Sequence, residues 1–317
     1  MLGYRSAPMS APSDDPSNVR PTRPDVAAAA PDVEAIEAVI RRAVDERRRD
    51  LVDIVGNGEL SIALRWQGTA GPQVVKRVPP FRSAEHAASY SALVRRHIDE
   101  LEAAGTRCVA TTTHTLERSD GSTVVYHSQP LLHVPLLADH VLRAAEPDEG
   151  HPLVHAVLDR TVRALAAGVP IDSQFANWYW FDGEPWQLDL TTPLYVVDGD
   201  VCFDTTGFVR EYPWPVRRVV YRELMKIAPQ HSNVDFVVRD IAVQLYRQQL
   251  DPWVDVVLRA ARDRHGVHVD AADAKKTCES DAKFFPTLLR LKRAQRAWMQ
   301  RTRRRYDTLL PDRSSFG

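Results

Sequence analysis

Apolar positions along the chain change their spacing twice, from helical to alternating and then back to helical. The apolar residues from Val33 to Val44 recur on one helical face, which predicts a helix that Pro31 opens and that runs to about Asp50. Alternation of apolar and polar residues, bounded by turn signals, then predicts strands on both sides of a second helix. The strands are expected at residues 60–66, 74–78, 110–117 and 123–129, with the second helix at 83–104.

Helical spacing dominates from Pro130 onward. A helix over 152–167 ends at Gly168 and Pro170, a combination typical of a helix stop. A short hairpin follows, with its turn at 182–185. Further helices are expected at about 216–228, 234–248, 252–264 and 284–306. The sequence therefore predicts an α+β protein in which a small antiparallel sheet precedes a larger, mainly helical part.

This pattern divides the chain into three segments. Residues 1–31 are rich in Pro, Ser, Ala and Asp without apolar periodicity, which predicts a disordered tail. Residues 32–129 hold the first helix and the strands, and residues 130–317 hold the helical part with the hairpin.

Composition narrows the class of protein. Among 317 residues, Lys and Arg number 41 against 42 Asp and Glu, so no overall field attracts nucleic acid or a membrane surface. Three widely spaced cysteines without a CxxC pair argue against a disulfide framework or a zinc cluster. No apolar run approaches the roughly 18 residues that a membrane helix needs. We therefore expect a cytoplasmic protein with neither a membrane nor a nucleic-acid partner.

The candidate chemistry lies in the hairpin and in the loop before it. Asp172 follows the helix, Asn177 comes five residues later, and Asp189 comes at the end of the hairpin. Phosphoryl transfer needs one carboxylate to orient the attacking hydroxyl, and an amide and a second carboxylate to hold Mg²⁺. A loop followed by a tight hairpin brings three such side chains together.

Two features of the first strands fit the same chemistry. Lys76 lies on a predicted strand, where its ammonium would hold phosphate groups. Gly56 and Gly58 form a glycine turn ahead of it, where small residues let backbone N–H groups approach phosphate oxygens.

With these residues in this order, the sequence resembles the aminoglycoside phosphotransferase and choline kinase-like family over roughly residues 50 to 250. The resemblance implies a two-lobed protein-kinase-like fold, with ATP and Mg²⁺ in the cleft between the lobes and a small-molecule hydroxyl as acceptor. By this resemblance Asp172 is the catalytic base, Asn177 and Asp189 bind the metal, Lys76 touches the phosphates, Glu85 pairs with Lys76, and Gln129 to Leu131 present backbone groups to adenine. Glu100 and Glu102 are alternative partners for Lys76.

The sequence departs from the family pattern at three positions. Pro170 stands where the family usually has His, Thr191 stands where a Gly or a carboxylate often follows the metal-binding Asp, and Ser61 replaces a third glycine. Pro170 and Thr191 keep open a pseudokinase that binds nucleotide or a partner without chemistry. A further alternative keeps the fold but transfers AMP instead of the γ-phosphate.

Two further clusters have structural as well as functional interpretations. Aromatic residues crowd the hairpin between Trp178 and Trp186, and they fit cross-strand packing or a wall against a cationic substrate. Residues 290–305 carry eight basic and no acidic side chains. They fit a solvated helix face or a patch for an acidic partner.

Overall fold

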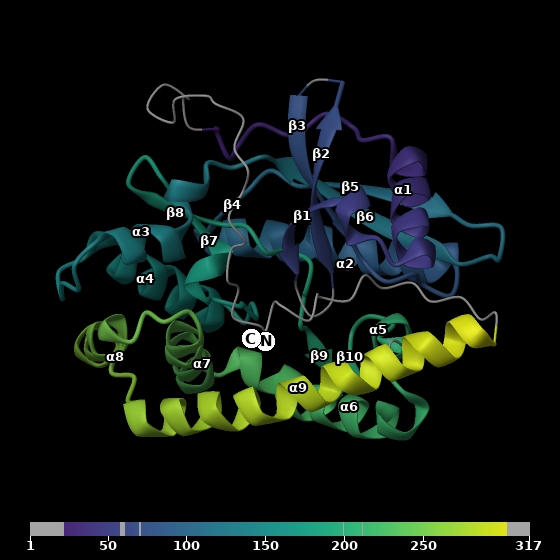
Figure 1. Cartoon of the computed structure of the whole chain (residues 1–317). Helices are drawn as coiled ribbons and strands as arrows, with labels where there is room; N and C mark the ends of the chain where they lie inside the picture. The colour runs from purple at the N-terminus through teal and green to yellow at the C-terminus, as the bar shows by residue number, and fades with distance from the viewer. Residues whose placement is uncertain (1–21, 58–60, 70, 199, 211, 303–317) are drawn as a thin grey trace.

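The computed structural model describes residues 22–57, 61–69, 71–198, 200–210 and 212–302. Its largest sheet has five antiparallel strands in the order β1-β2-β3-β6-β5 (Figure 1). The strands are β1 (Asp53–Asn57), β2 (Ile62–Gly68), β3 (Gly71–Arg77), β5 (Thr112–Glu117) and β6 (Thr123–Pro130). β3 is central, and its Lys76 lies opposite His127 of β6.

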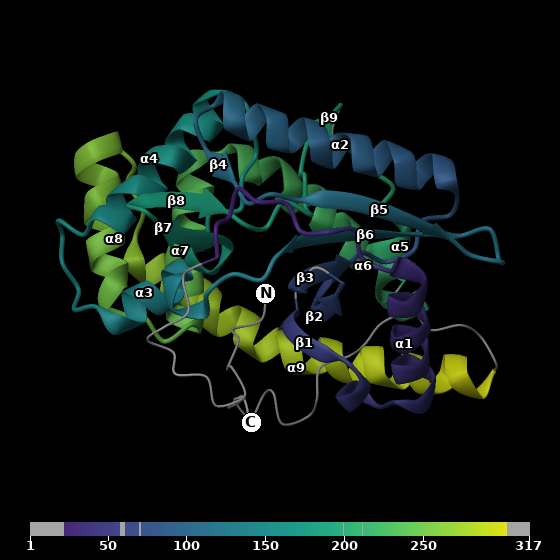
Figure 2. The same cartoon turned by 90° about the horizontal axis from the view of Figure 1, so that it is seen from above.

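Two helices cover opposite faces of this sheet (Figure 2). α1 (Val33–Glu46) begins at Asp32, whose side chain caps the helix by accepting a hydrogen bond from the amide of Ala35. α2 (Ala84–Ala103) begins at Ser83 and packs on the other face. Each helix contributes its apolar stripe to a separate core, so the sheet is buried on both sides.

Alternation along β3 decides which side chains face which helix. Arg77 points to the α1 side, where its guanidinium binds Glu37 at 2.9 Å. Neighbouring side chains of a strand point to opposite faces, so Lys76 points to the α2 side. Lys76 is thereby kept apart from the ionic cluster beneath α1.

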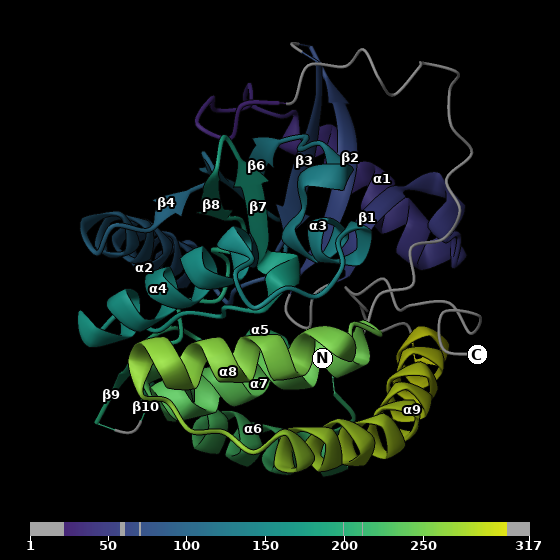
Figure 3. The same ribbon diagram turned by 90° about the vertical axis from the view of Figure 1, so that its left-hand side faces the viewer.

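Helices gather below the sheet and hold the largest core (Figure 3). α4 leads into the candidate loop, and the strands β7 and β8 form the hairpin after it, with β4 parallel to β8. The bounds are β4 (Arg107–Cys108), α3 (Ala138–Ala144), α4 (Pro152–Ala166), β7 (Trp178–Phe181), β8 (Glu184–Gln187), β9 (Val196–Val197), β10 (Asp200–Val201), α5 (Thr206–Arg210), α6 (Trp214–Ile227), α7 (Val234–Arg247), α8 (Pro252–His265) and α9 (Ala271–Arg301). Short 3₁₀ turns lie at Arg49–Leu51, Val134–Leu136, Phe175–Asn177 and Ala228–Ser232.

The last helix joins the two parts of the molecule. α9 starts beside α7 and α8 and runs under the sheet toward α1 (Figure 1). Near its end, Met299 is buried in the same core as Ile36, Ile40 and Tyr126. α9 therefore contributes to packing on both the helical part and the sheet.

The predicted α+β class, with a small antiparallel sheet and many helices, is confirmed. Several boundaries differ from prediction. Strand β1 was not predicted because Asp53 and Gly56 break the alternating pattern, and pairing with β2 forms it nevertheless. α3 and the β9–β10 hairpin were also missed because they are short. α9 begins at Ala271, well ahead of the predicted start at 284.

Part of the predicted disordered tail is ordered. The Pro24 carbonyl accepts a hydrogen bond from the Ala110 amide at 2.7 Å, and the Thr22 carbonyl accepts one from the Tyr179 hydroxyl at 3.3 Å. These contacts attach residues 22–24 to β7 and to the segment after β4. Composition did not predict this attachment because its partners lie far along the chain.

Candidate functional site

The site is built where the central strand of the sheet meets the loop after the β7–β8 hairpin. Nζ of Lys76 lies 3.1 Å from Oδ1 of Asp189 and donates to the Leu188 carbonyl at 3.0 Å. The Lys76 side chain is 8% exposed and that of Asp189 is 28% exposed. The ion pair is therefore shielded enough to matter energetically, yet Asp189 keeps contact with solvent.

Asp189 is held ionised by its neighbours. The Thr191 hydroxyl donates to Oδ1 of Asp189 at 2.9 Å. Burial alone would raise the pKa of Asp189, but the charge of Lys76 and the hydrogen bonds from Thr191 and Lys76 lower it below its ordinary value. Thr191, noted as a departure from the family pattern, thus acts as a hydrogen-bond donor to this carboxylate.

The candidate loop is fixed through the backbone of Asp172. Its carbonyl accepts hydrogen bonds from Nε2 of Gln187 at 3.0 Å and from Nδ2 of Asn177 at 3.4 Å. Gln174 donates to Oδ2 of Asp172 at 2.9 Å and orients the carboxylate. Asp172 and Asn177 are therefore brought together on one loop, and Gln187 connects that loop to the hairpin strand that precedes Asp189.

Two residues that the sequence did not indicate act on Asp172. Burial, together with the charges of Asp240 and Asp189, raises the pKa of Asp172 to about 6, while His231 opposes this rise. Asp240 belongs to α7, and His231 is a buried residue of the turn before α7. A carboxyl group that titrates near neutral pH is suited to general base work. The sequence offered no signal for either neighbour, because both lie more than fifty residues beyond the loop.

A polar layer between the sheet and α2 lies behind Lys76. The Tyr90 hydroxyl donates to the Thr191 carbonyl at 2.7 Å and lies 3.3 Å from Nε2 of His127. His127 is fully buried, and burial together with the Lys76 charge lowers its pKa to about 3, so the imidazole is neutral. Tyr90 thereby connects α2 to the loop that carries Asp189.

The predicted glutamate partners of Lys76 lie elsewhere. Glu85 is exposed in the first turn of α2, and Glu102 is exposed near the end of that helix. Glu100 binds Arg96 at 2.7 Å and accepts a hydrogen bond from the Tyr195 hydroxyl. The prediction that Glu85 pairs with Lys76 is therefore not supported, because α2 turns Tyr90 toward the site and Lys76 binds Asp189 instead.

The remaining predicted nucleotide-binding residues are placed as follows. Gln129 is buried in β6, where its side chain donates to the Leu188 carbonyl at 2.9 Å, so it holds the Asp189 loop to the sheet. Leu131 follows directly after β6 and is half-buried. Gly56 lies in β1, where a Cβ would stand 3.2 Å from Cβ of Ala63, while Gly58 lies outside the described residues.

The donor atoms of the site decide which metal ion it suits. No group of three or more His, Cys, Asp and Glu side chains among the described residues is arranged to hold one. The site instead gathers two carboxylates and an amide, from Asp172, Asp189 and Asn177. Mg²⁺ is commonly held by one or two carboxylates, with water and phosphate oxygens as its other ligands. The residues present therefore fit Mg²⁺ that arrives with a nucleotide better than a metal held by protein alone.

Comparison with known proteins places the chain in a family. Residues 35–210 match the model of a family of unknown function, DUF6206. This chain belongs to the DUF6206 family. The matched region of the DUF6206 chain runs from α1 through α5 and includes every residue of the candidate site except His231 and Asp240.

Other comparisons add little. No curated protein matches the chain. Among solved structures, it is similar to the kinase domain of PknI from Mycobacterium tuberculosis, crystallised as a point mutant, at 14% identity and a TM-score of 0.28, covering 66% of this chain and 94% of that one. In the part of the chain that the structure describes, no helix is long and apolar enough to cross a membrane.

Proposed function

We propose that this DUF6206 protein is an ATP- and Mg²⁺-dependent phosphotransferase that acts on a hydroxyl of a small molecule, with a two-lobed protein-kinase-like arrangement. The observation that carries the proposal is the 3.1 Å ion pair between Lys76 and Asp189. It joins the central strand of the sheet to the loop after a hairpin, as nucleotide phosphates and their metal would require.

Each residue has a role that follows from its surroundings. Lys76 is a buried cation on a rigid strand, and it would bind the nucleotide phosphates once its ion pair with Asp189 loosens. Asp189 and Asn177 would hold Mg²⁺, which supplies positive charge against the phosphates. Asp172 would orient the acceptor hydroxyl and take its proton, for which a pKa of about 6 is suited.

The order of elements supports the same proposal. Three strands lead into a helix that covers one sheet face, two more strands complete the sheet, and a helix, a loop and a hairpin follow. Apart from β1 and α3, periodicity in the sequence predicted these elements in this order, and the family resemblance rests on that order. The acceptor remains unspecified, because contacts with it would come from the helical part, which varies among proteins of one fold.

A second candidate function is nucleotide binding without transfer. It is favoured by the side chain that α2 brings to the Asp189 loop, which is Tyr90 and not a carboxylate, and by Pro170 ahead of the loop. In that case the Lys76–Asp189 pair would be the resting state of a binding protein. Transfer of AMP is the third possibility, and it differs from phosphate transfer in the nucleotide product that is released.

Calorimetry with Mg·ATP tests the proposal. We expect the wild type to bind in a metal-dependent manner and Asp189→Ala to lose binding. Asp159→Ala serves as the matched control, because Asp159 pairs with Arg264 and not with a site residue. Absence of binding in a folded wild type would refute the proposal.

Product analysis then separates the three functions. The protein is incubated with Mg·ATP and a panel of hydroxyl acceptors. Release of ADP that depends on an acceptor supports phosphate transfer, and release of pyrophosphate supports AMP transfer. Binding without any acceptor-dependent product supports the second candidate.

A further inference from the structure

The helices α6 and α9 carry an unusual concentration of exposed apolar side chains. In the described part of the chain nine large apolar side chains are exposed, and six of them lie on these two helices. Trp214 is 80% exposed and Trp298 is 53% exposed. None of the side chains described in α6 is fully buried. Exposed apolar groups at this density mark an interaction surface more often than ordinary protein surface.

The same helices are strongly basic. Residues 214–227 and 290–301 contain nine Lys and Arg and one acidic residue, Glu223, although the whole chain has a net charge of −1. On α6, Trp214, Arg218, Tyr221 and Arg222 share one face, because they are spaced by four, seven and eight residues. All four are exposed. The surface is therefore cationic and apolar on the same helix face.

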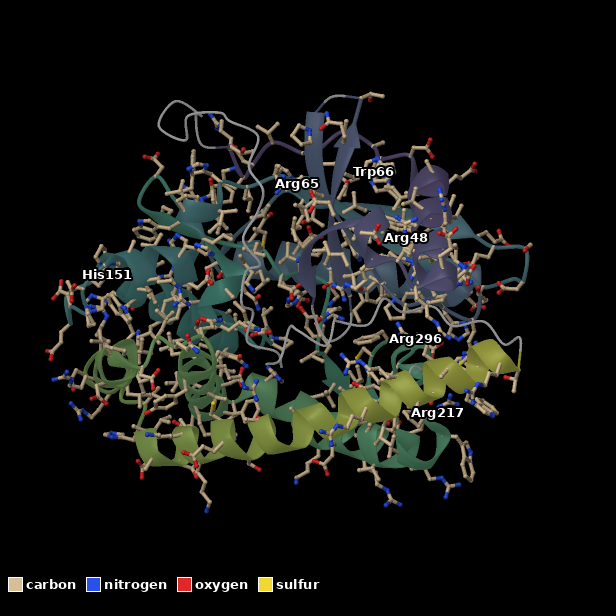
Figure 4. The ribbon with its side chains drawn as sticks, viewed as in Figure 1. Arg48, Arg65, Trp66, His151, Arg217 and Arg296 are labelled. Carbon is tan, nitrogen blue, oxygen red and sulfur yellow. The ribbon has the colours of Figure 1, made fainter. Side chains whose placement is uncertain are left out.

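Both helices are hydrogen-bonded to the same carbonyl at the end of α5. The carbonyl of Arg210 accepts from Nη2 of Arg217 at 2.9 Å and from Nε2 of Gln295 at 3.2 Å. Figure 4 shows Arg217 and Arg296 at the same end of the molecule. α6 and the C-terminal part of α9 thus form one continuous surface, which we call the basic-aromatic face.

The charge and the kinds of exposed side chain indicate which partner binds the basic-aromatic face. A second copy is disfavoured, because a two-fold contact would set the same cationic surface against itself. Nucleic acid would use the arginines and tryptophans but would gain nothing from exposed aliphatic side chains such as Val219, Ile227 and Leu291. A lipid surface uses all three kinds, because arginine binds anionic headgroups while aromatic and aliphatic side chains enter the interface.

We propose that the basic-aromatic face docks the protein on an anionic membrane surface, with α6 and α9 lying along the interface. This mode requires no spanning helix, so it is compatible with the absence of one among the described residues. It differs from our expectation of no membrane partner, which rested on the near-neutral net charge of the whole chain and on the lack of a spanning segment. An anionic membrane surface would also be the acidic partner that we considered for residues 290–305.

Vesicle co-sedimentation tests the proposal with the full chain. We expect binding to vesicles of phosphatidylcholine mixed with phosphatidylserine at roughly one part in three, little binding to pure phosphatidylcholine, and weakening of binding as salt is raised. Arg218→Glu with Arg222→Glu should weaken binding on the order of tenfold or more, because each basic residue near an anionic surface contributes to the attraction. Trp214→Ala with Trp298→Ala should weaken it through loss of interfacial insertion.

The control makes the same change of charge on a different helix. Arg259→Glu with Arg262→Glu alters two exposed arginines of α8 and should leave vesicle binding unchanged. If a double variant does not fold, as judged by thermal unfolding, the single variants Arg218→Glu and Trp214→Ala take its place. No binding by the wild type, equal binding to neutral vesicles, an equal loss in the α8 control, or tighter binding to a single-stranded RNA oligonucleotide would each overturn the proposal.

Discussion

The ammonium of Lys76 lies 3.1 Å from the carboxylate of Asp189, which is 113 residues further along the chain. The pair joins the sheet to the loop after the hairpin at a position where both side chains are largely shielded from water. Neither residue has another oppositely charged partner among the ion pairs of the described residues. The pair is thus the link on which the proposed nucleotide site depends.

Removal of the Lys76 charge should weaken nucleotide binding. For Lys76→Met we expect Mg·ATP affinity to fall roughly tenfold to hundredfold, since a hydrogen bond to a charged group is worth about 1.5–3 kcal/mol. Calorimetry measures the change. Lys276→Met, at an exposed position of α9, is the control, and an equal effect of both substitutions would contradict a specific role for Lys76.

The pH dependence of turnover should report the ionisation of Asp172. Because its pKa is raised to about 6, activity should rise as pH increases through about 6 and the carboxylate becomes able to accept a proton. Asp240→Asn removes a negative charge that raises this pKa, so the profile should move to lower pH. A profile that does not move would show that Asp240 has no influence on the base.

The same carboxyl group should limit stability. An acid whose folded-state pKa lies above its ordinary 3.8 contributes stability below about pH 4, and this contribution is lost as pH rises through about 6. We therefore expect Asp172→Asn to unfold at higher urea concentration than wild type at about pH 8 and to show turnover about 10²–10⁴-fold lower. Asp159→Asn is the control for both measurements. Unchanged turnover would refute the role of Asp172 as base.

The ionic cluster under α1 should be a main source of stability. Glu37 is buried and accepts hydrogen bonds from Arg77, Arg118 and Tyr126. Glu37→Gln leaves two buried guanidinium groups without their carboxylate, which should cost about 3–5 kcal/mol in the free energy of unfolding. Urea denaturation measures it, with Glu34→Gln on the exposed face of α1 as the control. A loss no larger than that of the control would contradict this view.

Acid pH should reduce the contribution of the same ionic cluster to stability. Burial opposes ionisation of Glu37, but the charge of Arg77 and the hydrogen bonds that Glu37 receives lower its pKa to about 2 from an ordinary 4.5. A depressed pKa contributes stability above about pH 4.5, which is lost as pH falls through about 2. The stability difference between wild type and Glu37→Gln should therefore shrink between about pH 4.5 and 2, as urea titrations at each pH would show.

The Tyr90 hydroxyl should be worth about 1 kcal/mol or more to folding. Tyr90→Phe keeps the ring contacts with Phe81 and Phe203 but removes the hydrogen bond to the Thr191 carbonyl. A buried carbonyl left unsatisfied costs about 1–3 kcal/mol. Urea denaturation of Tyr90→Phe against Tyr221→Phe, an exposed position, measures the effect, and equal stability of both variants would contradict it.

The local pattern of apolar and polar residues was sufficient to predict most helices and strands. The apolar stripe from Val33 to Val44 and the stop at Gly168 were predicted correctly because helix and turn preferences act over a few residues. Asp172 and Asn177 were recognised as one group because their spacing is local, and the structure brings them to the same loop.

Tertiary structure decided the rest. The sequence assigned Lys76 and Asp189 to one site from the needs of phosphoryl transfer, but the family resemblance implied Glu85 rather than Asp189 as the partner of the lysine. The buried face of α2 packs against Val125 and Phe203, and this packing placed Tyr90 at the site. His231 and Asp240 reach Asp172 only because α7 packs against the loop. Sequence periodicity shows which faces are buried, but the partners across each interface are chosen by long-range packing, because contacts between distant segments leave no local signal in the chain.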